Sequence, residues 1–209
     1  MIHLKSFSEQ HSLMNENVIP FKISPFFELA IDTVYSIKLP RIEWAGSLFQ
    51  LVDHNRAYLS EYLPWVDHTL SAKDSEHFIK HSLEQAEKGK SLHLCIWEKE
   101  CLVGLIGLHY IDRLDRKTEI GYWISEEHQG KGIITKCCQR LIKFCFQDLQ
   151  LHRVEIRCQA SNLRSQSIPK QLGFKHEGTL RGAFFRNGQF SDCLIFGLLA
   201  TDQLVNVKY

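Results

Sequence analysis

The pattern of apolar and polar positions divides this chain into short strands and longer helices. Runs of apolar or alternating residues predict seven strands, at residues 31–39, 92–97, 102–111, 118–124, 153–159, 174–180 and 190–199. Apolar residues at helical spacing predict helices at residues 43–62, 71–89, 132–147 and 163–172. We therefore expect a mixed α/β (α+β) fold in which one sheet carries helices on both faces.

The first residues of the chain do not share this pattern. Residues 1–28 have no clear periodicity, and Pro20 and Pro25 interrupt them. We expect an N-terminal extension over residues 1–28 and one domain over residues 29–209. The 209 residues are 44% hydrophobic, which is enough for a sizeable core.

Charge and hydropathy argue against two classes of partner. The net charge is +1, which gives no case for nucleic-acid binding or for an electrostatic membrane anchor. No apolar run approaches the roughly 18 residues of a membrane span, and the N-terminus lacks the apolar region of a signal peptide.

The seven cysteines are odd in number, form no Cys-x-x-Cys pair and mostly fall in apolar strand or helix patterns. We interpret them as free, buried thiols, which indicates a reducing cytoplasmic location.

One pair of histidines has the spacing of metal ligands. His77 and His81 are four residues apart on a predicted helix, and Glu84 falls on the same face. In the zinc-protease motif a glutamate follows the first histidine directly, but Phe78 stands there. We interpret the pair as part of a solvated helix face and expect no metal.

A glycine-rich turn joins the strand that ends at Ile124 to the helix at 132–147. The residues Gln129-Gly130-Lys131-Gly132 open that helix. Free amides and the positive end of the helix dipole favour an anion there, although Gly-x-Gly alone fits an ordinary connection equally well. The turn does not fit a Walker loop, because the run from Gly130 to Lys136 lacks the Gly-x-x-x-x-Gly-Lys-Ser/Thr pattern. It does not fit a dinucleotide fingerprint either, because Thr135 stands where that motif needs a small residue.

Further motifs follow this turn in a fixed order. Gln129 and Gly132 fit a Gln-x-x-Gly-x-Gly/Ala pattern, although Ile134 stands where a small residue is usual. Downstream come Asn162-Leu-Arg-Ser165, then Leu172-Gly-Phe174, then Asn187-Gly-Gln-Phe-Ser-Asp192. This series, over roughly residues 30–202, resembles the GNAT superfamily of N-acetyltransferases, in its RimJ/RimL branch that acetylates ribosomal-protein N-termini. The resemblance implies the GNAT fold, a mostly antiparallel seven-stranded sheet with a splay between strands four and five.

The resemblance also implies acetyl-CoA as cosubstrate. The backbone of Trp123 and Ile124 would hold the pantetheine arm, and backbone N–H groups at the splay would polarise the thioester carbonyl. Asn162 would contact the pantetheine, cap its helix, or do both. The pyrophosphate would bind at Gln129, Gly130, Lys131, Gly132, Ile133, Ile134 and Thr135.

Two residues are candidates for catalysis. By resemblance Ser165 protonates the departing thiolate, since no tyrosine occurs between Tyr122 and Tyr209; the alternative is a helix-capping serine. Glu119 is the candidate base, and its alternative is an exposed strand-edge carboxylate. The branch often offers a glutamate in the turn after Leu180, but Phe184 stands there in this chain.

The chain departs from the family pattern just after the serine. Pro169-Lys170 replaces the usual leucine–glutamate pair. Proline has no N–H to bond the carbonyl of Ser165 and clashes with the preceding turn. We therefore expect a kinked or shortened helix there.

The acceptor is the least determined part. We expect direct attack, in a ternary complex, by the α-amino group of a protein such as a ribosomal protein. Cys137 and Cys138 are interpreted as packing residues rather than acyl carriers. The alternatives are a small amine (a polyamine, amino sugar or antibiotic) and a non-catalytic acyl-CoA-binding module. Trp65 lines the acceptor groove or belongs to the core, and we expect a monomer or a homodimer.

Overall fold

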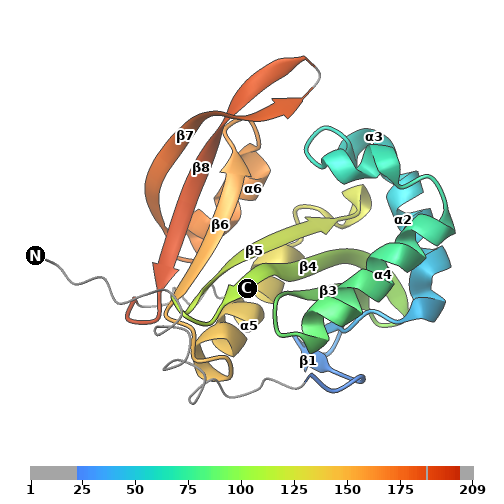
Figure 1. Ribbon diagram of the computed structural model, residues 1–209. Helices are drawn as coiled ribbons and strands as arrows, with labels where there is room; N and C mark the ends of the chain where they lie inside the picture. Colours follow the sequence, from blue (N-terminus) through green and yellow to red (C-terminus); the bar gives the residue numbers. More distant parts are fainter. Residues whose placement is uncertain (1–22, 187, 203–209) are drawn as a thin grey trace, which may run out of the picture.

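A single mixed sheet organises the molecule, as the computed structural model shows for residues 23–186 and 188–202 (Figure 1). Most of the predicted extension and Asn187 lie outside the described residues. The strands are β1 (Glu28–Ala30), β2 (Tyr35–Lys38), β3 (Leu92–Glu98), β4 (Cys101–Asp112), β5 (Lys117–Ile124), β6 (Arg153–Gln159), β7 (Lys175–Arg186) and β8 (Gln189–Leu199). Their order in the sheet is β1-β2-β3-β4-β5-β6-β8-β7.

The splay predicted between strands four and five is present between β5 and β6. All other neighbours pair antiparallel, whereas β5 and β6 pair parallel and for three residues only, ending at Glu119 opposite Glu155. Beyond that point the two strands diverge, so the residues from Ile120 to Ile124 do not pair with β6. The edges of both strands are therefore open to a ligand along this gap.

Among the described residues the sheet has eight strands, so the prediction of seven was wrong. Of the predicted strand at 31–39 only β2 forms, and it pairs with an additional short strand, β1, that precedes it, with Leu29 opposite Ile37. The cause is local, because the Asp32 carboxylate accepts the amides of Val34 and Tyr35 at 2.8 and 2.9 Å and turns the chain there.

The helix predicted at 43–62 is also broken into pieces. It consists of a 3-10 turn η1 (Ile42–Trp44), helix α2 (Ala45–His54) and a short α3 (Arg56–Leu59), before a second 3-10 turn η2 (Pro64–His68). The break falls at Asn55, whose buried side chain donates to the carbonyl of Leu51 and accepts the amide of Glu126 at 2.8 Å. Asn55 thus ties the end of α2 to the chain just after β5.

Helices cover both faces of the sheet, as predicted. Helix α4 (Ala72–Glu87) packs with α2 over one face, where Trp123 is buried. Helix α5 (Ile133–Gln147) packs on the other face against Ile120 and Ile124, next to α6 (Leu163–Gln171). Alternate residues of β5 thus serve two separate cores. None of the helices in the described part of the chain is long and apolar enough to cross a membrane.

Helix α6 runs through Pro169 without a break, so the predicted kink or shortening was wrong. The carbonyl of Ser165, which loses its usual donor at Pro169, accepts a hydrogen bond from the hydroxyl of Tyr122 at 3.0 Å. Three residues after Pro169, the amide of Leu172 donates to the carbonyl of Ile168 in the normal helical pattern. A side chain from β5 therefore replaces the missing backbone donor.

Candidate active site

The splay opens into one large cleft of about 2060 Å3. Its walls come from β5, β6, the turn before α5 and the start of α6 on one side, and from α2, η2 and α4 on the other. Every residue predicted for the site lines it, namely Glu119, Trp123, Ile124, Gln129, Gly130, Lys131, Gly132, Ile133, Ile134, Thr135, Asn162 and Ser165.

The glycine turn has the geometry of an anion site. Gly130 and Gly132 both have φ of 71°, the left-handed conformation that glycine adopts without strain. Gly132 is the N-cap of α5 and has no side chain that could cap the free amides of that first turn. These amides point out from the positive end of a 15-residue helix, which suits a pyrophosphate.

Residues that the sequence did not single out hold this turn in place. His128 accepts or donates a 2.6 Å hydrogen bond with the hydroxyl of Ser125, and its other ring nitrogen lies 3.3 Å from the carboxylate of Glu98. On the opposite side, the guanidinium of Arg164 bonds the side-chain oxygen of Gln129. Arg164 therefore brings a second cation from α6 to the turn that Lys131 already charges.

The predicted acid sits at the start of α6. The amide of Ser165 donates to the side chain of Asn162 at 2.9 Å, which confirms the capping interpretation of that asparagine. The hydroxyl oxygen of Ser165 lies 3.3 Å from the hydroxyl of Tyr122 and 3.2 Å from the sulfur of Cys158. These contacts fix the Ser165 side chain at the edge of the cleft.

The thiols do not offer a nucleophile for an acyl intermediate. All seven cysteines are free, and all except Cys101 are buried. Burial raises the pKa of Cys137 to about 12 and that of Cys138 well above its ordinary value. Both side chains therefore stay protonated at neutral pH, as expected for packing residues.

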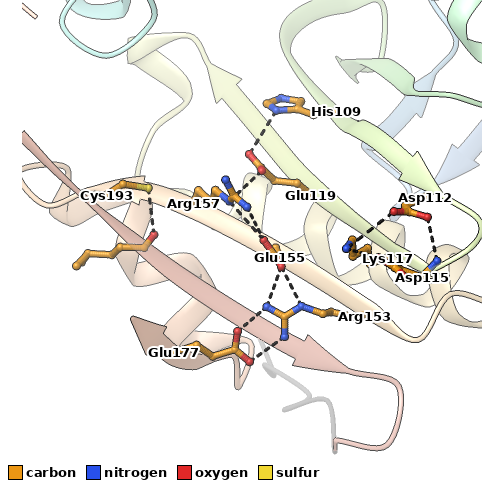
Figure 2. Close-up of polar contacts among 11 residues, drawn as sticks. His109, Asp112, Asp115, Lys117, Glu119, Arg153, Glu155, Arg157, Glu177 and Cys193 are labelled. Atoms are coloured by element: carbon orange, nitrogen blue, oxygen red, sulfur yellow. Dashed lines mark hydrogen bonds and ion pairs between the residues drawn. The ribbon is translucent and has the colours of Figure 1, made fainter. Parts of the chain in front are cut away.

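Glu119 lies in the middle of a row of ion pairs that crosses the sheet (Figure 2). One of its oxygens is 3.2 Å from Nε of Arg157, and the other is 3.5 Å from Nδ1 of His109. Arg157 also pairs with Glu155. The Glu119 side chain is only 17% exposed, so the alternative of an exposed strand-edge carboxylate was wrong.

Small residues on β4 and β5 make room for rings beside Glu119. Gly107 and Gly121 face each other across the two strands. The imidazoles of His93 and His109 lie over them with centroids 6.1 Å apart. Toward the mouth of the cleft, Trp65 is 38% exposed with its ring 5.9 Å from that of Trp123. Trp65 therefore lines the cleft rather than the core.

His77 and His81 are exposed on α4 and are not among the residues that line the cleft. Over residues 23–186 and 188–202, no group of three or more His, Cys, Asp or Glu side chains is arranged to hold a metal ion.

Comparison with known proteins decides the family. A family model described as an acetyltransferase (GNAT) domain matches residues 37–175. The chain belongs to the GNAT family. It is an acetyl-CoA-dependent N-acetyltransferase, and the open splay and the bare amides of the glycine turn fit that cosubstrate. Acetyl-CoA supplies the activated acetyl thioester.

Curated relatives of this GNAT enzyme differ in the acceptors that their names give. The "Putative ribosomal N-acetyltransferase YdaF" of Bacillus subtilis is 33% identical over 83% of this chain and 95% of its own length. The "Ribosomal-protein-serine acetyltransferase" of Escherichia coli is 31% identical over 75% of this chain and 87% of its own length. A "Spermidine N(1)-acetyltransferase" of Escherichia coli is 29% identical over 78% of this chain and 85% of its own length.

Among solved structures, the microcin C7 self-immunity acetyltransferase MccE in complex with acetyl-CoA and AMP is 28% identical, with a TM-score of 0.77. That match covers 81% of this chain and 94% of MccE.

Proposed function

We propose that this enzyme acetylates the N-terminal α-amino group of a protein, of the kind found on ribosomal proteins, by direct attack in a ternary complex. Two relatives above 30% identity carry ribosomal names, which supports a protein acceptor. The cleft of about 2060 Å3 extends from the splay to the partly exposed Trp65, which leaves room for an extended peptide. The buried thiols of Cys137 and Cys138 favour direct attack over an acyl-enzyme.

The choice of a protein acceptor over a polyamine rests on the contacts that the carboxylates in the cleft already make. A polyamine needs several free carboxylates to replace the water around its ammonium groups. Among the described lining residues, Glu119 is paired with Arg157. Asp74 accepts three hydrogen bonds in the capping box of α4. Glu61 and Glu126 are the other two acidic side chains that line the cleft, and both are exposed to solvent. This arrangement favours a single ammonium over a polycation.

We assign roles to the site residues on this basis. Backbone groups of Trp123 and Ile124 at the splay hold the pantetheine arm and polarise the acetyl carbonyl. Asn162 contacts the same arm while it caps α6. The hydroxyl of Ser165 gives its proton to the departing thiolate. Glu119 assists the removal of a proton from the acceptor ammonium. The glycine turn from Gln129 to Thr135 binds the pyrophosphate.

The test is an acceptor panel. The enzyme is incubated with acetyl-CoA and either N-terminal peptides of ribosomal proteins or small amines such as spermidine and an amino sugar, and release of free thiol is followed. We expect turnover with peptides. The same peptides with a blocked N-terminus and a free lysine serve as controls, since they separate α-amine from side-chain acetylation. Turnover with spermidine and none with peptides would overturn the proposal.

A further inference from the structure

His109 and Glu119 lie together at the point where the splay begins. We propose that His109 is the catalytic base that takes the proton of the acceptor ammonium, and that Glu119 positions its imidazole. This inference rests on the proposed function, and it revises the role of Glu119 from base to partner. Both oxygens of Glu119 are already engaged, one by Arg157 and one by Nδ1 of His109 (Figure 2).

Gly121 brings the other ring nitrogen of His109 to the reaction site. A Cβ atom placed on Gly121 would lie 2.0 Å from Nε2 of His109, so the imidazole occupies the space that a side chain would fill. Gly121 stands two residues beyond Glu119, in the part of β5 that has no partner in β6. This is the stretch of backbone, just before Trp123, where the acetyl group is expected. Nε2 is thus placed beside the junction of donor and acceptor.

The neighbouring imidazole of His93 is not suited to act as the base, because of its surroundings. His93 is largely buried, its ring packs against Phe78 at 5.5 Å, and its Nδ1 has no hydrogen-bond partner. Burial and the neighbouring His109 lower the pKa of His93 to about 4. His93 therefore stays neutral and is a weak base at neutral pH. His109 is 50% exposed, so it can pass a proton on to solvent.

The titratable and charged groups around His109 come from three neighbouring strands and one helix. Glu119 faces it from β5, and Arg157 on β6 pairs with Glu119 and with Glu155. His93 faces it from β3 and is neutral, and His81 on α4 lies beyond His93. Once His109 has taken the proton, its positive imidazole is therefore next to the carboxylate of Glu119, whose other oxygen is held by Arg157. This arrangement orients the ring with Nδ1 toward Glu119 and leaves Nε2 for the substrate.

The proton balance closes with residues of this site. Nε2 of His109 takes one proton from the ammonium and releases it to solvent. The lone pair of the freed amine forms the C–N bond to the acetyl carbon as the C–S bond breaks. Ser165 delivers its proton to the sulfur, and the second proton, which leaves nitrogen as the amide forms, restores the Ser165 hydroxyl. The overall change consumes an ammonium and a thioester and yields an amide, a thiol and one proton.

The first experiment replaces His109 by Asn, which keeps a polar group near Glu119 but cannot act as a base. With a peptide acceptor, we expect kcat to fall by about 10²-fold while KM for acetyl-CoA stays unchanged, since general bases contribute about 10²–10⁴-fold. The rise of kcat with pH that depends on the imidazole should disappear, and added imidazole should restore part of the rate of His109→Ala. His77→Asn, on the exposed face of α4, is the matched control and should behave as the wild type.

The second experiment moves the ring without removing it. In Gly121→Ala the new methyl group would take the place of Nε2, so the same loss of kcat and of the pH-dependent rise is expected. Gly46→Ala, where a Cβ meets nothing within 4 Å, is its control.

The results separate this inference from the proposed function. If the wild type acetylates no peptide, the proposed function fails. If it does, and His109→Asn keeps both rate and pH profile, the base assignment alone is overturned. Survival of the pH-dependent rise in His109→Asn and its loss in Glu119→Gln would return the role of base to Glu119.

Discussion

The hydroxyl of Tyr122 donates a 3.0 Å hydrogen bond to the carbonyl of Ser165, four residues before Pro169. Burial raises the pKa of Tyr122 well above its ordinary value, so this hydroxyl keeps its proton and remains a donor. It also lies 3.3 Å from the hydroxyl oxygen of Ser165. The Tyr122 side chain thus supplies the hydrogen bond that α6 loses at Pro169, and it also holds the hydroxyl of Ser165, the proposed acid, in place.

The first prediction concerns this replacement of a backbone donor. Tyr122→Phe leaves the carbonyl of Ser165 unpaired and should lower the free energy of unfolding by about 1–3 kcal/mol. Pro169→Ala restores an amide donor for the same carbonyl, so in that background Tyr122→Phe should cost clearly less. Denaturant unfolding of the two single variants and the double variant measures the coupling. Equal costs of Tyr122→Phe in both backgrounds would contradict this account.

The second prediction tests the acid. Ser165→Ala removes the hydroxyl but keeps the amide that donates to Asn162, so α6 should stay capped. We expect kcat to fall by about 10²-fold with little change in the Kd for coenzyme A. The reason is that loss of the general acid slows acetyl transfer but does not affect coenzyme binding. Steady-state kinetics and calorimetric titration provide both numbers. Ser167→Ala, two residues further along the same helix, is the control. An unchanged kcat in Ser165→Ala would remove the assignment.

The third prediction compares two left-handed glycines. Gly132 and Gly89 have φ of 71° and 64°, so alanine should cost each about 1–2 kcal/mol of stability through the same backbone strain. Only Gly132→Ala should also weaken coenzyme A binding, by at least tenfold, because its methyl group and distorted amides face the pyrophosphate. Binding titrations of both variants decide this. Equal affinities would mean that the coenzyme site lies elsewhere.

The parts of this molecule that the sequence predicted are those with local signals. The glycine turn and the cap at Asn162 follow from short motifs whose residues are adjacent in the chain, whereas the splay was implied by the family resemblance. The predicted site residues all line one cleft because the family pattern fixes the strands and the turn that carry them.

The parts that the sequence did not predict depend on contacts between distant residues. The unbroken helix at Pro169 needs Tyr122, which lies 43 residues away from the carbonyl of Ser165. The break after α2 depends on Asn55 reaching the amide of Glu126, 71 residues later. The pairing of His109 with Glu119 is similar, since neither residue type nor spacing distinguishes His109 from the other histidines.

The last prediction concerns the support under the glycine turn. The carboxylate of Glu98 accepts the hydroxyl of Tyr35 at 2.5 Å and lies 3.3 Å from His128, and these contacts hold the pKa of Glu98 below its ordinary value. A lowered carboxyl pKa stabilises the fold above the unfolded value of about 4.3, and this contribution is lost as pH falls through the folded value. Glu98→Gln should therefore flatten the loss of stability below about pH 4.3 and, by freeing His128, weaken coenzyme A binding at neutral pH. Urea midpoints measured against pH test the first effect, with the exposed Glu100→Gln as control. If the stability of Glu98→Gln falls with decreasing pH as steeply as that of the wild type, the contacts of the Glu98 carboxylate do not stabilise the turn.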